Sequence, residues 1–150
     1  ILGYMLNAGF AEEVKAWHAK NPSVPLRFFW DNAAEAPVKV VDDTLSFYYL
    51  DDKEFLRQMA GCMAYASTAG FESICEAMYL GKPLMMVPSH IEQKCNAYDA
   101  TRFDAAVESE TFDLDVLLSF ARDGKFRRDE GFPAWALSAA EVFAKELESM

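Results

Sequence analysis

Short apolar runs that favour β-strands alternate along this chain with segments of helical periodicity. The strand-like runs are residues 1–6, 26–30, 38–41, 45–49, 62–67 and 84–87. The helical segments are residues 11–20, 52–58, 72–80, 92–103, 113–121 and 134–148. Because strands that alternate with helices form a parallel sheet, we predict an α/β fold: a doubly wound, Rossmann-like sheet with helices on both faces. Ligands of such sheets bind beyond the carboxyl ends of the strands.

Length and composition indicate one folded domain over residues 1–150. Hydrophobic residues make up 52% of the chain, which is enough for a sizeable core. The formal net charge of −10 argues against a general nucleic-acid surface, because such surfaces need clustered Lys and Arg. The chain starts without Met in an apolar run, so we expect it to be cut from a longer protein that carries a further domain.

Neither the cysteines nor the acidic pairs predict a metal site. The three cysteines are an odd number without C-x-x-C spacing, so no disulfide framework is predicted either. The doublets Asp42-Asp43 and Asp51-Asp52 are more typical of turns and helix caps than of metal ligands. No apolar run reaches the roughly 18 residues of a membrane span. We therefore expect a cytoplasmic domain that could touch the inner face of a membrane only through parts outside this sequence.

A turn of small residues, 67–70, joins the strand at 62–67 to the helix at 72–80. Small residues let the backbone approach a ligand, and the free N–H groups of the first helical turn form an anion site that the helix dipole assists. A diphosphate fits this site. An ordinary turn with Ser or Thr capping the helix is the alternative, and spacing alone does not decide between them. No complete G-x-G-x-x-G or Walker pattern is present, so no standard dinucleotide site or P-loop is predicted.

Glu76 lies one helical turn beyond this predicted anion site. It follows Glu72 by four residues and Ser73 by three, so the three side chains share a helical face. A carboxylate at this position can accept both hydroxyls of a ribose while the helix start binds phosphates. A solvent-facing Glu is the alternative.

Polar residues also follow the strand at 84–87, again at a carboxyl end. His90, Glu92 and Gln93 lie where a loop enters the next helix, and a carboxylate beside an amide suits sugar hydroxyls, which both donate and accept. The alternative is that Glu92 is a first-turn acid favoured by the helix dipole and that Gln93 is a surface residue. His90 has no identifiable carboxylate partner, so the case for it as a catalytic base is weak. The other histidine, His18, is expected on the surface of its helix.

Taken together, these features resemble the carboxy-terminal donor-binding domain of GT-B glycosyltransferases. The similarity is greatest to the plant-type UDP-glycosyltransferases and to the enzyme that adds N-acetylglucosamine to lipid I. The shared pattern stands here as Gly70, Ser73, Glu76, Gly81 with Pro83, Pro88, Glu92 with Gln93, and Asn96 with Ala97. Two positions depart from the plant-type pattern: Thr68 replaces a diphosphate-binding His, and Leu50 stands roughly where a Trp stacks on uracil.

The resemblance implies a role for each part of the pattern. The diphosphate would be bound by Thr68, Ala69, Gly70, Glu72 and Ser73, and by Asn7 and Gly9 in the loop after the first strand. The ribose would be bound by Glu76, the transferred sugar by His90, Glu92 and Gln93, and the base by Tyr49 and Leu50. Asn96 and Ala97 are expected to serve packing and helix stability.

The resemblance also implies a reaction: transfer of a hexose-type sugar from a nucleoside-diphosphate sugar, UDP-sugar first, to an acceptor that the sequence does not identify. No cofactor or metal is expected. The acceptor and the usual catalytic base belong to the amino-terminal domain of such enzymes, so this chain alone should be inactive. Two alternatives stay open: a nucleotide-sugar epimerase of the same fold, and a non-catalytic α/β binding module.

Overall fold

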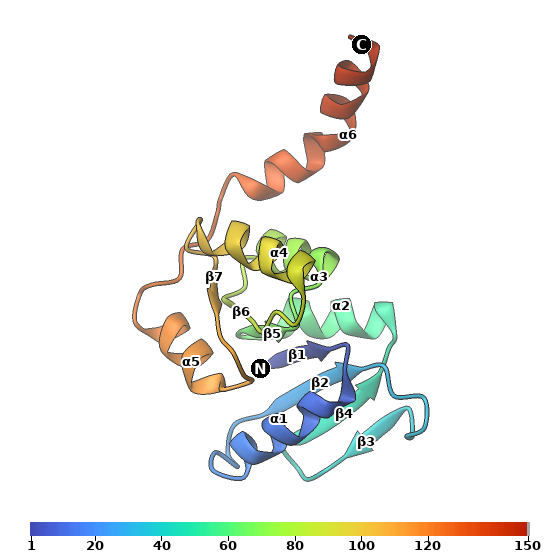
Figure 1. Ribbon diagram of the computed structural model, residues 1–150, viewed down its shortest axis with the longest axis vertical. Helices are drawn as coiled ribbons and strands as arrows, with labels where there is room; N and C mark the ends of the chain where they lie inside the picture. The colour runs from blue at the N-terminus through green and yellow to red at the C-terminus, as the bar shows by residue number, and fades with distance from the viewer. Residues whose placement is uncertain (150) are drawn as a thin grey trace.

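The structure is a computed structural model that describes residues 1–149, and a seven-stranded sheet runs through its centre (Figure 1). The strands are β1 (Leu2–Met5), β2 (Leu26–Trp30), β3 (Val38–Val40), β4 (Leu45–Tyr49), β5 (Tyr65–Ser67), β6 (Leu84–Met86) and β7 (Ala106–Glu108). The α-helices are α1 (Ala11–His18), α2 (Asp52–Gly61), α3 (Phe71–Tyr79), α4 (Ile91–Thr101), α5 (Leu114–Arg122) and α6 (Phe132–Glu148), and a 3-10 helix, η1 (Ala8–Phe10), precedes α1.

The strand order confirms the predicted doubly wound fold. The order is β3-β4-β2-β1-β5-β6-β7, and every neighbouring pair is parallel except β3 with β4. Without the antiparallel edge strand β3, the chain winds outward from β1 to β4 and then returns to β5 on the other side of β1. This is the Rossmann order, whose direction reverses between β1 and β5. A ligand crevice is expected at the carboxyl ends of these two strands.

Two apolar clusters cover the two faces of the sheet. On one face, α1 and α5 pack Trp17 and Leu117 against strand residues such as Phe28. On the other face, α2, α3 and α4 pack against Leu2 and Phe29. The helix α6 instead projects away from the sheet (Figure 1) and buries none of its residues. The predicted covering of both sheet faces is therefore confirmed.

Two strands differ from the sequence-based prediction by more than one residue at an end. The strand β7 was not predicted, because Ala106–Glu108 contains a single β-branched residue and is held by its pairing with β6. The strand β5 starts at Tyr65 rather than at residue 62, because Cys62 still belongs to the end of α2: its N–H donates to the Met59 carbonyl at 3.2 Å. Neither difference changes the topology.

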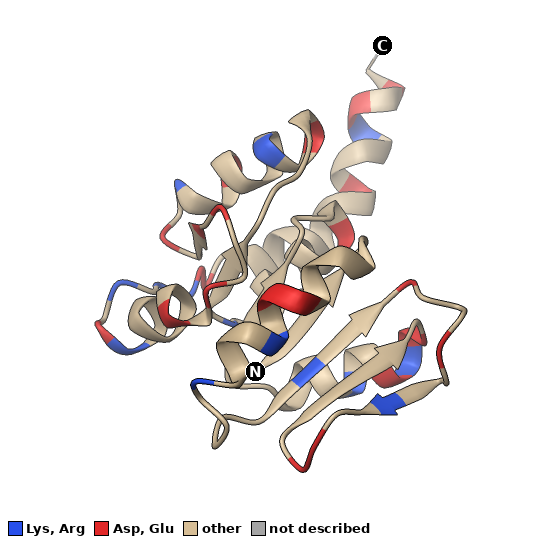
Figure 2. Cartoon of the chain, turned by 60° about the horizontal axis from the view of Figure 1, so that its bottom comes forward, with Lys and Arg blue, Asp and Glu red and all other residues tan. Residues whose placement is uncertain are grey.

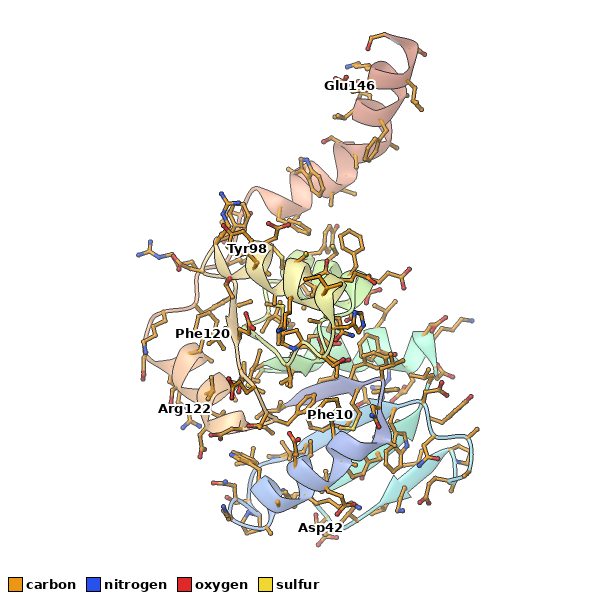
Figure 3. The ribbon with its side chains drawn as sticks, viewed as in Figure 1. Phe10, Asp42, Tyr98, Phe120, Arg122 and Glu146 are labelled. Carbon is orange, nitrogen blue, oxygen red and sulfur yellow. The ribbon has the colours of Figure 1, made fainter. Side chains whose placement is uncertain are left out.

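The prediction that His18 lies on the surface is wrong. Its side chain is buried, at 3% exposure, and its Nε2 lies 3.0 Å from Asp42 Oδ2. Asp42 also accepts the backbone N–H groups of Thr44 and Leu45, each at 2.8 Å, as expected of a turn-forming residue. The turn between β3 and β4 thus covers the end of α1, which helical periodicity cannot reveal. Asp42 lies at the end of the molecule opposite α6 (Figure 3).

Charged side chains are distributed over many elements rather than gathered on one of them (Figure 2). The three cysteines are free thiols. Among the described residues, no helix combines the length and the apolar character that crossing a membrane would require.

Candidate functional site

A cleft of about 870 Å³ opens at the carboxyl ends of the strands, between the starts of α2 and α3. We call it the α2–α3 cleft. The strands β1 and β2 contribute Tyr4 and Phe29, the start of α2 with the residues before it contributes Leu50, Asp51, Asp52, Phe55 and Leu56, and the start of α3 contributes Gly70, Phe71, Glu72, Ser73, Cys75 and Glu76. The cleft therefore lies at the crevice that the strand order predicts.

The helix α3 starts without a side-chain cap. Its N-cap residue, Gly70, has extended backbone, and no side chain accepts from the first amides of the helix. The Ser73 hydroxyl instead donates to the Gly70 carbonyl at 3.2 Å. The alternative interpretation of this turn, in which Ser or Thr caps the helix, is therefore wrong. The residues that carry these uncapped N–H groups line the cleft, at the positive end of the helix dipole.

The turn before α3 is held in an unusual conformation. Ala69 has a left-handed φ of 65°, and its N–H donates to Ser67 Oγ at 3.0 Å. The Ala69 carbonyl accepts from Asn96 Nδ2 of α4 at 3.0 Å. Asn96 was expected to serve packing and helix stability, and the structure shows that it fastens this turn to α4.

The residues predicted to bind a diphosphate fall into two groups. Gly70, Glu72 and Ser73 line the cleft. Thr68 and Ala69 belong to the same turn but are buried, with 1% and 0% exposure, and are not in the lining. The Thr68 hydroxyl is buried without a hydrogen-bond partner among the described residues, and the Thr68 N–H donates to the Tyr4 carbonyl at 3.3 Å.

Asn7 and Gly9 lie at the carboxyl end of β1 but outside the cleft lining. The Asn7 side chain caps η1 by accepting the Gly9 N–H at 2.8 Å. The predicted tight turn is therefore the capped start of a 3-10 helix, and contact of these residues with phosphate stays a prediction.

Glu76 lines the cleft on the side of α3, one turn from the start of the helix, as predicted. Partial burial raises the pKa of its carboxyl group, and the nearby carboxylates of Glu72 and Asp52 raise it further. A ligand hydroxyl that donates to Glu76 would stabilise its charged form.

Of the two residues predicted to contact a base, the structure brings one to the cleft. Leu50 is in the lining and is 39% exposed, whereas Tyr49 is outside it. Next to Leu50, Asp51 Oδ1 accepts the Glu54 N–H at 2.8 Å, so Asp51 caps α2 as predicted for one member of this acidic doublet. Leu50 can offer a base an apolar surface but no ring for stacking.

His90, Glu92 and Gln93 lie at the start of α4, after β6, and none of them lines the cleft. Gln93 is buried, at 3% exposure, and its Oε1 accepts from both the N–H and the hydroxyl of Ser89, at 2.8 and 2.9 Å. Because the side chain is buried, the alternative that Gln93 is a surface residue is wrong. The Gln93 amide instead holds the loop through Ser89. His90 and Glu92 are exposed, and contact with a sugar stays a prediction.

Sequence reasoning missed the aromatic side of the cleft. Tyr4 and Phe29 come from strands whose apolar runs read as core, and Phe55 comes from the first turns of α2. The signal that the sequence offers is the polar tip of Tyr4 near the carboxyl end of a predicted strand. The lining also contains four acidic residues, Asp51, Asp52, Glu72 and Glu76, and no Lys or Arg. An anion in this cleft must therefore be bound by neutral donors.

Residues 18–123 match the sequence model of the family described as glycosyl transferase family 1. No curated protein matches the chain significantly. Several solved glycosyltransferases share its fold. The glycotransferase of kitacinnamycin superposes with a TM-score of 0.70 at 15% identity, over 96% of this chain and 42% of that one.

Two further structures contain a nucleotide ligand. SsfS6 from Streptomyces sp. SF2575, complexed with thymidine diphosphate, gives a TM-score of 0.54 at 19% identity, over 96% of this chain and 37% of that one. UGT89C1 from Arabidopsis thaliana, complexed with UDP-L-rhamnose, gives a TM-score of 0.53 at 19% identity, over 83% of this chain and 34% of that one. The chain spans less than half the length of each of these three enzymes. The fold likeness and the family match, which covers more than half of the chain, confirm the resemblance to GT-B glycosyltransferases, and the chain belongs to glycosyl transferase family 1.

Proposed function

We propose that this chain binds a nucleoside-diphosphate sugar in the α2–α3 cleft and forms the donor-binding part of a glycosyltransferase. The intact enzyme would transfer a hexose-type sugar to an acceptor bound elsewhere in the protein. The observation that carries the proposal is the uncapped start of α3, which opens into the cleft with Glu76 one turn further on. Family membership makes glycosyl transfer the reaction to which this geometry is best suited.

The start of α3 supplies what a diphosphate needs. The backbone amides from Gly70 to Ser73 would donate to phosphate oxygens, and the helix dipole adds a favourable potential. Because the lining has no Lys or Arg, these amides would be the main groups that stabilise the charge developing on the departing diphosphate. Stabilisation by backbone amides would not require a metal ion.

Glu76 would bind the ribose. An ionised carboxylate accepts hydrogen bonds from two neighbouring hydroxyls, and the position of Glu76 within the cleft leaves the helix start free for the phosphates. The acidic side chains around it would repel a phosphate at that position. The same residues therefore favour one orientation of the donor: ribose toward Glu76 and diphosphate toward Gly70.

Base and sugar would lie on either side of this centre. Leu50 would pack on the base. We propose a pyrimidine, uracil first, since one related structure contains UDP-L-rhamnose and another contains thymidine diphosphate. The exposed His90 and Glu92 at the start of α4 would contact the transferred sugar, with Gln93 holding their loop.

Calorimetric titration of the chain with UDP, GDP and TDP tests the proposal. At least one should bind, and Glu76→Ala should weaken binding about tenfold or more, because a hydrogen bond to a charged group contributes about 1.5–3 kcal/mol. Ser73→Ala should weaken binding less. Glu146→Ala, near the far end of α6 (Figure 3), is the matched control and should change nothing. Failure of all three nucleotides to bind would contradict the proposal.

Product analysis of the intact enzyme tests the reaction itself. With a nucleotide sugar and an acceptor, we expect a glycosylated acceptor and a free nucleoside diphosphate. Formation of an epimerised nucleotide sugar without any acceptor would contradict transfer and favour an epimerase.

A further inference from the structure

Three aromatic rings form a connected cluster at the base of the α2–α3 cleft. We call Tyr4, Phe29 and Phe55 the aromatic cluster. The rings of Phe29 and Phe55 meet edge to face with centroids 5.2 Å apart, and those of Tyr4 and Phe55 with centroids 6.3 Å apart. Phe29 is fully buried, whereas Tyr4 is half-buried. The cluster therefore fixes the ring of Tyr4 while leaving part of this side chain open to the cleft.

The hydroxyl of Tyr4 is free to bind a ligand. It has no hydrogen-bond partner among residues 1–149, and it is not one of the fully enclosed polar atoms of that region. The other hydroxyl in the lining belongs to Ser73 and already donates to the Gly70 carbonyl. Cys75 offers only a weak S–H donor, and no Lys or Arg lines the cleft. In the described lining, Tyr4 thus provides the one strong side-chain donor that is uncommitted.

The sheet places Tyr4 between the strands that lead to the proposed base and diphosphate positions. Tyr4 pairs in register with Ser67 of β5, the strand that leads into the turn before α3. On its other side it pairs with Phe29 of β2, which is followed in the sheet by β4 and the cleft residue Leu50. A nucleotide that extends along the cleft from Leu50 to the start of α3 would pass Tyr4.

We propose that Tyr4 is a donor-binding residue whose hydroxyl donates a hydrogen bond to a phosphate oxygen of the bound nucleoside diphosphate. This inference rests on the proposed function and adds a residue to it. A neutral phenol suits a cleft whose four carboxylates already repel the phosphates, because it offers a donor without a negative charge. Burial raises the pKa of the Tyr4 hydroxyl, and Asp31 raises it further, so the proton needed for donation is present at neutral pH.

The substitution Tyr4→Phe tests this assignment, since it removes the hydroxyl and keeps the ring contact with Phe55. Tyr48→Phe is the matched control: Tyr48 is a partly buried tyrosine on the same face of the sheet, stacked on Phe29, and it does not line the cleft. Calorimetry with UDP should show about tenfold or more weaker binding for Tyr4→Phe and unchanged binding for Tyr48→Phe. Binding of uridine, followed by ligand-observed NMR, should be the same in all three proteins.

The outcomes separate this inference from the function on which it rests. If the unsubstituted chain binds UDP and Tyr4→Phe binds it equally well, the inference is overturned and the proposed function stands. An equal loss for UDP and uridine also overturns it, because the hydroxyl then serves the base or the ribose. If the unsubstituted chain binds neither UDP nor TDP nor GDP, both fail. Melting curves verify folding, and the phosphorus NMR signals of bound UDP, which should shift only in Tyr4→Phe, give a reading independent of stability.

Discussion

Replacement of Asn96 by Ala should loosen the turn on which the proposed diphosphate site depends. The Asn96 side chain donates from α4 to the carbonyl of Ala69, a residue without any exposure to solvent. Once the amide is removed, no other side chain within residues 1–149 donates to this carbonyl. The left-handed backbone of Ala69 would then no longer be stabilised by the hydrogen bond from Asn96.

The size of the effect follows from two opposing contributions. A buried carbonyl without a partner costs about 1–3 kcal/mol. Ala is a better helix former than Asn by up to about 0.7 kcal/mol, and position 96 lies within α4. The net destabilisation is therefore about 0.3–3 kcal/mol. For a domain of this size each kcal/mol corresponds to roughly 2–4 °C, so the melting temperature should fall by about 1–12 °C.

Urea unfolding followed by circular dichroism measures this difference. Asp99→Ala is the control, since it gives α4 the same kind of gain in helix propensity and the Asp99 side chain makes no hydrogen bond within residues 1–149. Asp99→Ala should be as stable as the unsubstituted chain or slightly more stable. Nucleotide affinity should fall in Asn96→Ala and not in Asp99→Ala. Equal stability of the two variants would refute the reasoning that Asn96 fastens the turn.

Two further predictions concern a turn and the base position. Hydrogen bonds lower the pKa of Asp42 from 3.8 to about 2, and the bond from the Thr44 N–H has the largest effect. The contribution of Asp42 to stability is therefore complete above pH 3.8 and is lost as the pH falls toward 2. Urea midpoints should therefore fall more steeply with acid in the unsubstituted chain than in Asp42→Asn, and equal slopes would contradict this. Leu50→Trp should tighten UDP binding about fivefold or more, because base stacking on an aromatic ring contributes roughly 1–3 kcal/mol; unchanged calorimetric affinity would mean that the base lies elsewhere.

Most of the fold was predictable because the local signals agree with the sheet. The strands at 26–30 and 45–49 were placed with their observed bounds, since each is a β-prone run with turn-forming residues beside it. Residues 106–108 carried no such signal, because their strand depends on β6 for its hydrogen bonds. Burial of His18 was likewise not predictable, since it depends on a turn 24 residues further along the chain.

The candidate site was predictable where it depends on local order and not where it depends on strand orientation. The start of α3 and Glu76 belong to one helix, so their spacing placed them on one face. Thr68 and Ala69 were assigned to a ligand, but the left-handed turn places both beneath the surface. Tyr4 was overlooked because β1 is apolar on both faces, and such a strand does not show which side chains reach the cleft.

The amide NMR spectrum of the chain during titration with UDP tests the central claim most directly. If the diphosphate binds at the uncapped start of α3, the largest shifts should belong to the backbone amides of residues 70–73, with smaller ones at Glu76 and Leu50. Binding of UDP that leaves these amides unchanged, or that shifts Asn7 and Gly9 most, would contradict the account.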